Sequence, residues 1–402
     1  MSFHAYGPAG DDLALLDDLR RGDDLPQGAD EPFWRAPYSF LWSALYCGGI
    51  LTPATVDGVR YLVRTVAEPG FGGEDRPLRV AAVWFLREVA REVLTGVDRA
   101  KASRRDDPDV RSWLIGYLRE RRFVLGWTDA DAPGRVLLAA ARVDCFDLLP
   151  QVYTAVEPLL ATQAPALRGC AALTAATLSG HPDLVVHRPR LLAYLLAEGA
   201  STDAHYRASM LLGVGELGGS PRAWLRDPHP GVRVCAALAP ALADDPEANT
   251  VLLTEASRDP DVIGMGGFQG MGLSALPNPE ATLAERLCAV VRDVDRLLPA
   301  AIAAVPSAPT YLDIGTQRRA PGALAEPYLR VLFPDGLLPS PAAATPAQRR
   351  LAATVTRHAT FGEPDTQQRP SRGGYHEAWN ATFSRLGLPN DRSSWQTLAD
   401  HV

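Results

Sequence analysis

The stretch that decides the fold lies in the middle of the chain and reads Asp227-Pro228-His229-Pro230-Gly231-Val232-Arg233-Val234-Cys235-Ala236-Ala237-Leu238. An aspartate at this place predicts a helix cap, and a proline directly after it is tolerated in the first helical turn. The small, Ala-rich residues that follow the arginine allow neighbouring helices to approach closely. The stretch therefore predicts the start of a helix that packs tightly against other helices.

The same pattern recurs along the chain. Asp-Pro or Pro, followed by Val or Leu and then Arg or a small-residue run, is found at Asp107-Pro108, at Pro165 and at Asp259-Pro260. Asp227 and Asp259 are 32 residues apart, and the other units are longer or shorter. This recurrence predicts a degenerate two-helix repeat of roughly 30 to 40 residues. One hairpin cannot bury its apolar face alone, so the repeats are expected to stack.

Helical periodicity extends over most of the chain, whereas alternating β-branched runs are nearly absent. In residues 77–89, one stripe contains Leu78, Phe85 and Val89, with Arg79 and Arg87 off it. The sequence thus predicts an all-α protein. We expect a regular helical repeat array over 1–294, and irregular helical repeats with a cap over 295–402, continuous with the array.

These motifs resemble the HEAT-repeat superfamily, including the phycobilisome-lyase-type repeats with the pattern D-P-x-V-R-x-x-A-A-x-A-L. The opening His4-Ala5-Tyr6-Gly7-Pro8-Ala9 is similar to a group of actinobacterial HEAT proteins that begin H-A-Y-G-P-A-D-D. The chain departs from that group at 47–51, where it has Cys-Gly-Gly-Ile-Leu in place of a histidine-containing H-Q-G-T stretch. The resemblance implies an α-solenoid of HEAT-like antiparallel helical hairpins and says little about chemistry.

The overall charge argues against a protein that coats nucleic acid. The 402 residues are 47% hydrophobic and carry a formal net charge of −7. A protein of that class is expected to have an excess of basic residues. Lys101 is the only lysine, so the positive charge is nearly all arginine, which we interpret as the codon bias of a high-GC genome. Nucleic acid is not an expected partner.

The cysteines and the N-terminus indicate where the protein is found. The five cysteines are widely separated and include no C-x-x-C, so we expect reduced thiols rather than disulfides or a zinc site. The N-terminus has no leader pattern of charged and then apolar residues, and no run of about 18 apolar residues occurs. These features predict a cytoplasmic protein without a membrane segment.

Sequence motifs with a known chemistry are missing, so we expect no metal and no cofactor. The chain contains no H-E-x-x-H, P-loop or G-x-S-x-G motif. His181 and Asp183 are expected in a solvated turn rather than at a metal. The glycine-rich stretch 264–272 leads into a formal match to the dinucleotide fingerprint, but no strand precedes it, and a nucleotide role is not expected.

Two groups of residues are candidates for binding. Tyr38, Trp42 and Tyr46 are spaced by four residues, which predicts one helix face. These aromatic residues are expected either in the core between stacked hairpins or on a concave recognition surface. The second group surrounds Arg207, which is expected to bond a carboxylate of a neighbouring repeat. The candidate residues are Tyr38, Trp42, Trp84, Arg87, Trp113, Tyr117, Asp203, His205, Tyr206 and Arg207.

Charged residues alternate on the helix that contains Trp84. Arg87, Glu88, Arg91 and Glu92 follow one another closely, and the same is true of residues 119–122. We expect these side chains to form solvated ion pairs on a helix surface.

Two classes of function remain open at this stage. In the first, the chain is a scaffold or adaptor that binds another polypeptide on a concave surface, which requires no catalytic group. In the second, it is an enzyme or enzyme subunit on a HEAT-like scaffold, either in specialised-metabolite biosynthesis such as aziridine formation or with DNA-glycosylase-like activity. A pocket with clustered Arg, Asp and His would favour the second class. A small-molecule ligand therefore stays open as well.

Overall fold

The chain is mostly helical in the part that its computed structural model describes. The described residues are 2–23, 32–73, 76–120, 133–201, 203–259, 262, 267–268, 273–274, 279–306, 325–359, 361 and 373–400. The chain forms two compact units, Met1–Ala197 and Glu198–Val402. The expected all-α class is confirmed. The boundary expected at residue 294, between regular and irregular helical repeats, stays a prediction.

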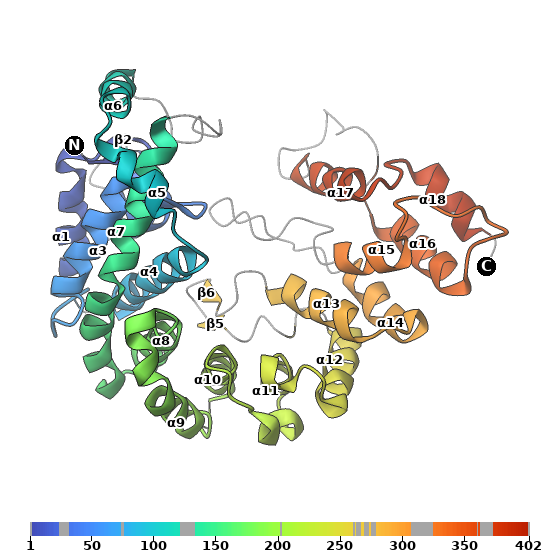
Figure 1. Ribbon diagram of the computed structural model, residues 1–402. Helices are drawn as coiled ribbons and strands as arrows, with labels where there is room; N and C mark the ends of the chain where they lie inside the picture. Colours follow the sequence, from blue (N-terminus) through green and yellow to red (C-terminus); the bar gives the residue numbers. More distant parts are fainter. Residues whose placement is uncertain are drawn as a thin grey trace. The chain divides into compact units, whose positions relative to one another are not determined.

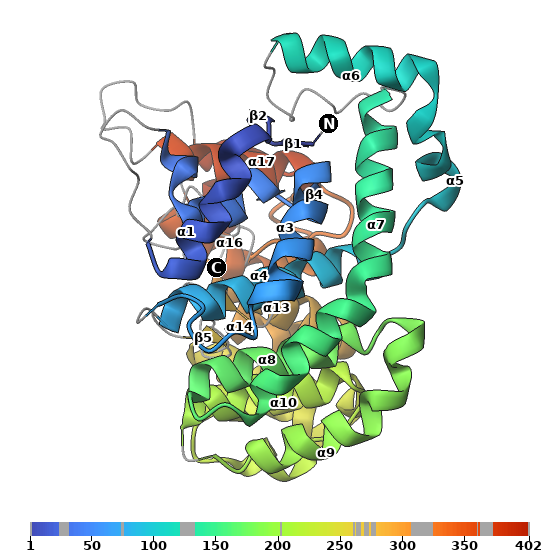
Figure 2. The ribbon, with the colours of Figure 1, turned by 90° about the vertical axis from the view of Figure 1, so that its left-hand side faces the viewer.

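The first unit is built around one buried helix. Its helices are α1 (Leu15–Arg21), α2 (Pro37–Ser39), α3 (Pro53–Thr65), α4 (Arg76–Leu94), α5 (Arg99–Ala102), α6 (Pro108–Glu120), α7 (Pro133–Val156), α8 (Pro165–Leu178) and α9 (Arg188–Glu198). Helix α3 lies along α7, and α4 packs against α8 (Figure 1 and Figure 2). Every residue of α4 from Val80 to Ala90 is buried. The prediction that only one stripe of this helix is buried is therefore wrong, because neighbouring elements cover all its faces.

The second unit is a succession of packed helices. These are α10 (Ala204–Glu216), α11 (Pro230–Ala237), α12 (Pro246–Arg258), α13 (Pro279–Val290), α14 (Val294–Ala304), α15 (Glu326–Leu332), α16 (Pro346–His358), α17 (Gly373–Leu386) and α18 (Arg392–Ala399). Helix α11 packs against both α10 and α12 (Figure 1). Further along, α12 packs on α14, α14 on α16, and α16 on α18. Each of these helices thus covers an apolar face of the next.

Strands are confined to three two-residue pairs among the described residues. The pairs are β1 (Phe3–His4) with β2 (Gly7–Pro8), β3 (Tyr46–Cys47) with β4 (Ile50–Leu51), and β5 (Gly267–Phe268) with β6 (Leu273–Ser274). All three are antiparallel. In the first hairpin Gly7 has φ 141°, a value that favours glycine. The predicted G-x-G-x-x-[GA] stretch lies mostly outside the described residues.

A recurring contact holds the start of several helices in place. The side chain of the fourth helical residue reaches back and donates a hydrogen bond to the backbone carbonyl two residues before the N-cap. We call this contact the helix brace. It joins Arg168 to Thr162 O (3.2 Å), Arg207 to Ser201 O (2.6 Å), Arg233 to Asp227 O (2.7 Å), Asn249 to Ala243 O (3.3 Å) and Trp395 to Pro389 O (3.0 Å).

Unlike residues make the helix brace at the fourth helical position. Arginine, asparagine and tryptophan share one property at this position, a side-chain N–H that reaches the carbonyl. The helices α8, α10, α11 and α12 begin at residues 165, 204, 230 and 246, so their starts are 39, 26 and 16 residues apart. The spacing is more irregular than predicted, yet the local geometry of the helix start is kept.

Asp227 is not the helix cap that the sequence predicts. Helix α11 begins at Pro230, and its N-cap is His229, whose side chain accepts a hydrogen bond from the backbone N–H of Gly231. The carboxylate of Asp227 accepts the N–H of His229 instead, at 2.8 Å. The second proline, rather than the first, occupies the first helical turn, because Asp227 and Pro228 form the turn that leads into the helix.

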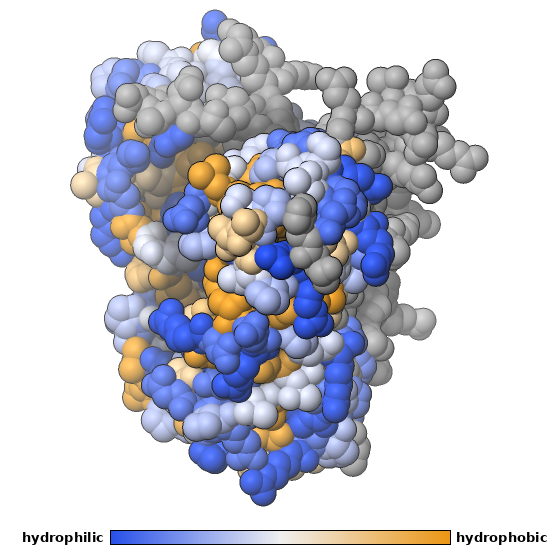
Figure 3. Space-filling model, turned by 90° about the vertical axis from the view of Figure 1, so that its right-hand side faces the viewer, coloured by the Kyte–Doolittle hydropathy of each residue, from blue (hydrophilic) through white to orange (hydrophobic). Residues whose placement is uncertain are grey.

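Hydrophobic and hydrophilic residues are interspersed on the face of the molecule that Figure 3 shows. Over the described part of this face, the hydrophobic residues occur in small groups. Among the described residues, no helix has both the length and the hydropathy that a membrane span requires.

The helix brace predicts unequal effects for two arginines that lie close in sequence. Arg233 bonds the carbonyl of Asp227 and, at 2.6 Å, the carboxylate of Glu255 on α12. Arg233→Met should lower the free energy of unfolding by about 1 to 3 kcal/mol, because both acceptors lose their donor. Urea denaturation measures this change. As a control, Arg226→Met should leave the midpoint unchanged, since Arg226 is exposed and pairs only at the surface with Glu247. Equal effects of the two substitutions would contradict the assignment.

Candidate functional site

The polar group predicted around Arg207 lies at the start of α10. Asp203 is the N-cap of this helix, and its carboxylate accepts the backbone N–H groups of His205 (2.9 Å) and Tyr206 (3.1 Å). The Tyr206 ring is buried, and its hydroxyl donates to the carboxylate of Glu198. These bonds fix the first turn of α10 and connect it to the end of the preceding helix.

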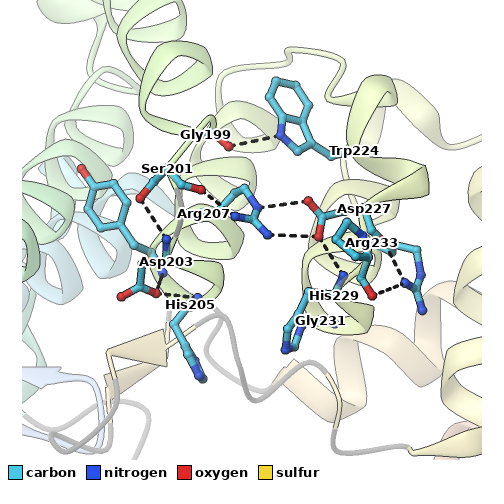
Figure 4. Close-up of polar contacts among 12 residues, drawn as sticks. Gly199, Ser201, Asp203, His205, Arg207, Trp224, Asp227, His229, Gly231 and Arg233 are labelled. Carbon is cyan, nitrogen blue, oxygen red and sulfur yellow. Dashed lines mark hydrogen bonds and ion pairs between the residues drawn. The ribbon is translucent and has the colours of Figure 1, made fainter.

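Arg207 joins α10 to the turn before α11 (Figure 4). Its Nε and Nη2 atoms lie 3.1 Å from the two carboxylate oxygens of Asp227. Both side chains are largely buried, with exposed fractions of 13% and 10%. The Nη2 atom donates a hydrogen bond to Asp227, whereas the Nε atom is at ion-pair distance without hydrogen-bond geometry. A charge-assisted pair with this burial is stronger than a surface pair. The bond expected between Arg207 and a neighbouring carboxylate is therefore present.

The pair continues into the next helix. The backbone carbonyl of Asp227 accepts the helix brace of Arg233, and Arg233 also bonds Glu255 of α12. We call the series Arg207, Asp227, Arg233 and Glu255 the arginine–carboxylate ladder. It connects three consecutive helices, α10, α11 and α12. Of the residues predicted around Arg207, only Arg207 itself belongs to the ladder, whereas the carboxylate of Asp203 caps α10.

Two histidines lie beside the ladder. Figure 4 shows the imidazoles of His205 and His229 on the same side of α10 and α11. The Nδ1 atom of His229 accepts the N–H of Gly231 at 3.2 Å, so the remaining proton is on Nε2. Among the described residues, no group of three or more His, Cys, Asp or Glu side chains is placed to hold a metal ion.

Tyr38, Trp42 and Tyr46 of the first unit are neighbours, but they do not lie on one helix face. Tyr38 belongs to α2, Trp42 to the π-helix η3 (Phe40–Leu45), and Tyr46 begins strand β3. Their ring centroids are 6.4 Å apart between Tyr38 and Trp42, and 6.0 Å apart between Trp42 and Tyr46. All three side chains are only partly buried. We call these three residues the aromatic row.

Neighbouring elements hold the π-helix that contains Trp42. The carbonyl of Ala44 accepts the N–H of Ala5 at 3.0 Å, and the carbonyl of Leu45 accepts the hydroxyl of Thr55 at 2.5 Å. The ring of Trp42 packs edge-on against buried Phe85 at 6.0 Å. A π-helix lacks the regular bonds of an α-helix, so contacts from outside are needed to keep it. These contacts position the aromatic row.

The other three predicted aromatic residues lie elsewhere. Trp113 stacks on Tyr117 at 5.1 Å, and Tyr117 packs against Phe3. Trp84 is 1% exposed and belongs to the core. For Trp84 and Tyr117, the core alternative holds, and a role as exposed recognition residues is wrong because their rings are covered.

Arg87 and Glu88 are buried, which corrects the predicted solvated pairing. Their side chains are 0% and 3% exposed. The Arg87 guanidinium lies 4.8 Å from the Trp84 ring centroid and donates from Nε to Thr177 on α8 at 3.0 Å. Glu88 accepts Nη1 of Arg91 at 3.0 Å. The periodicity was misleading for Arg87 because α8 packs against α4 and Thr177 of α8 bonds this arginine.

Sequence reasoning missed a second aromatic contact in the first unit. The rings of Tyr6 and Trp34 stack at 5.1 Å with an angle of 5° between them. Tyr6 belongs to the H-A-Y-G-P-A opening, so the motif itself was the signal that could have led to this pair. His181, expected in a solvated turn, is buried and packs on Phe146, and its Nδ1 atom caps a short helix.

The described cysteines are poor nucleophiles. Burial raises the pKa of the Cys235 and Cys288 thiols to about 12, and it also raises the pKa of Cys47, Cys145 and Cys170. At neutral pH these groups are therefore protonated, whereas catalysis would need the thiolate.

Comparison of the chain with protein-family models, with curated proteins and with solved structures finds no match. The HEAT relationship inferred from the sequence therefore stays a prediction. The candidate site consequently depends on the geometry of this chain alone, namely the aromatic row and the arginine–carboxylate ladder.

Glu88 provides a test of the buried charges in the first unit. Glu88→Ala should lower the free energy of unfolding by about 2 to 4 kcal/mol, because Arg87 and Arg91 lose a buried carboxylate. The measurement is chemical denaturation followed by tryptophan fluorescence. Glu157→Ala is the matched control, since its pair with Arg190 is exposed and should contribute below about 1 kcal/mol. A neutral Glu88→Ala variant would show that the buried pairing is not needed.

Proposed function

We propose that this chain is a HEAT-like α-solenoid of antiparallel helical hairpins that binds another polypeptide. The repeated helix brace supports a common origin for the helix starts in α8, α10, α11 and α12, as expected for tandem repeats. The arginine–carboxylate ladder ties successive helices together, which a repeat array needs because each unit depends on its neighbours.

The observation that carries the binding proposal is the aromatic row. Tyr38, Trp42 and Tyr46 form a connected series of rings that are partly exposed. Tyrosine and tryptophan side chains offer a large contact area with few rotatable bonds and dominate many protein interfaces. The row is also held in place by Ala5 and Thr55, so little order has to be gained on binding.

The ladder favours a structural role in the second unit over catalysis. The carboxylate of Asp203 caps α10, and the guanidinium of Arg207 is bonded to Asp227 and Ser201. Groups engaged in this way keep the fold together. The binding experiment described below also tests the enzymatic alternatives, including aziridine formation and DNA-glycosylase-like activity.

A double substitution in the aromatic row tests the proposal. Tyr38→Ala with Trp42→Leu removes most of the exposed ring area while the leucine still packs on Phe85. The tagged wild-type chain is purified from its native host, the co-purifying polypeptide is identified, and its binding is measured again with purified components. We expect the double variant to bind at least tenfold more weakly, since two aromatic contacts are lost.

Val186→Ala is the matched control, because Val186 is 75% exposed and lies outside the aromatic row. It should bind like the wild type. A partner that binds both variants equally would refute the aromatic row as the binding surface. If a small molecule or nucleic acid co-purifies and no polypeptide does, the enzymatic class replaces the proposed one.

A further inference from the structure

His4 is a buried histidine whose two ring nitrogens are both engaged. Its side chain is 1% exposed. The backbone N–H of Tyr6 donates to Nδ1 at 3.1 Å, so this nitrogen carries no proton. The proton is therefore on Nε2, which lies 3.0 Å from a carboxylate oxygen of Asp12 and donates to it. In this arrangement the imidazole is neutral.

Aromatic rings cover the rest of the imidazole. The ring centroids of Trp34 and Phe40 lie 5.0 Å and 5.6 Å from that of His4. Trp34 in turn stacks on Tyr6, which follows in the turn between β1 and β2. His4 thus sits where the N-terminal hairpin meets the short helix that contains Trp34 and the π-helix that contains Trp42.

The charged and titratable groups around His4 come from several elements. Asp12 bonds both His4 and Arg35, whose guanidinium is 3.2 Å from the second carboxylate oxygen. On α3, Asp57 accepts the hydroxyl of Ser2 at 2.6 Å. The Tyr6 hydroxyl and the Cys47 thiol lie close to each other, and burial raises the pKa of both. Arg35 already pairs with the negative charge of Asp12, so this carboxylate stabilises a charged His4 less than an unpaired carboxylate would.

We propose that protonation of His4 opens the hairpin β1–β2 and loosens the aromatic row. A second proton would be placed on Nδ1, directly facing the N–H of Tyr6, so an acceptor would become a donor and the bond would be lost. The next residue, Ala5, bonds the carbonyl of Ala44 in the π-helix at 3.0 Å. Opening of the hairpin therefore withdraws one of the contacts that hold Trp42.

The direction of the pH effect follows from the burial of His4. Burial lowers the pKa of His4 from its ordinary value of 6.5, although the bond to Asp12 opposes this shift. The closed hairpin thus binds the proton less well than the open one. Its stability is complete above pH 6.5 and is lost as the pH falls below that value. The effect on partner binding rests on the proposed function, whereas the opening itself does not.

Hydrogen exchange of the intact chain, followed by mass spectrometry, tests the proposal. The peptide that covers residues 2–9 reports on the amides of Ala5, Tyr6 and Ala9, and its protection is corrected for intrinsic exchange. Between pH 7.5 and 5.5 carboxylates ordinarily stay charged. Over this range we expect the protection to fall by up to about tenfold, because one proton is taken up on opening.

Two variants distinguish His4 from other groups. His4→Asn, which does not titrate, should show protection that changes little between the two pH values. His358→Asn removes an exposed histidine of α16 and should keep the wild-type response. Equal protection of the wild type at both pH values, or a fall of the same size in His4→Asn as in the wild type, would overturn the proposal. Because the readout needs no partner, its failure is separate from failure of the binding experiment.

Discussion

The helix brace is the constraint on which the starts of α8, α10, α11, α12 and α18 depend. A helix start leaves backbone groups without partners, and the loop before it has no regular bonds. One side chain in the fourth helical position satisfies a loop carbonyl and fixes the direction in which the chain enters the helix. In α10 and α11 the arginine that makes the brace also bonds a carboxylate. Arg207 of α10 bonds Asp227 in the turn before α11, and Arg233 of α11 bonds Glu255 of α12. One guanidinium group thus stabilises both the helix start and the packing of that helix against the next element.

Arginine suits this task better than lysine, because a planar fork of donors can serve a carbonyl and a carboxylate at once. The first unit uses the same chemistry at helix ends. Arg142 of α7 donates to the carbonyls of Glu92 and Gly96 at the end of α4, and Arg79 donates to Val66 at the end of α3. The near absence of lysine, which composition alone attributes to codon bias, therefore has a structural consequence.

The sequence was sufficient to predict the all-α class, because helical periodicity reflects local geometry. It also indicated that Tyr38, Trp42 and Tyr46 are neighbours, but the single helix face predicted from their spacing is wrong, since the three residues belong to an α-helix, a π-helix and a strand. It could not reveal that Arg87 and Glu88 are buried, since that depends on α8, which lies far away in the sequence. Asp227 was assigned to the wrong role for a related reason. An aspartate before a proline can cap a helix or shape the preceding turn, and the choice depends on His229 and Arg207. The engagement of His4 required the positions of Asp12 and Trp34, which no local pattern contains.

The central claim is that the arginine–carboxylate ladder couples consecutive helices. A double-mutant cycle on Arg207→Met and Asp227→Asn, measured by urea denaturation, tests it most directly. The account predicts a coupling energy of about 1 to 3 kcal/mol, because the two groups are largely buried and form an ion pair with one charge-assisted hydrogen bond. Additive effects, with a coupling indistinguishable from zero, would contradict the claim that this bond holds α10 against α11.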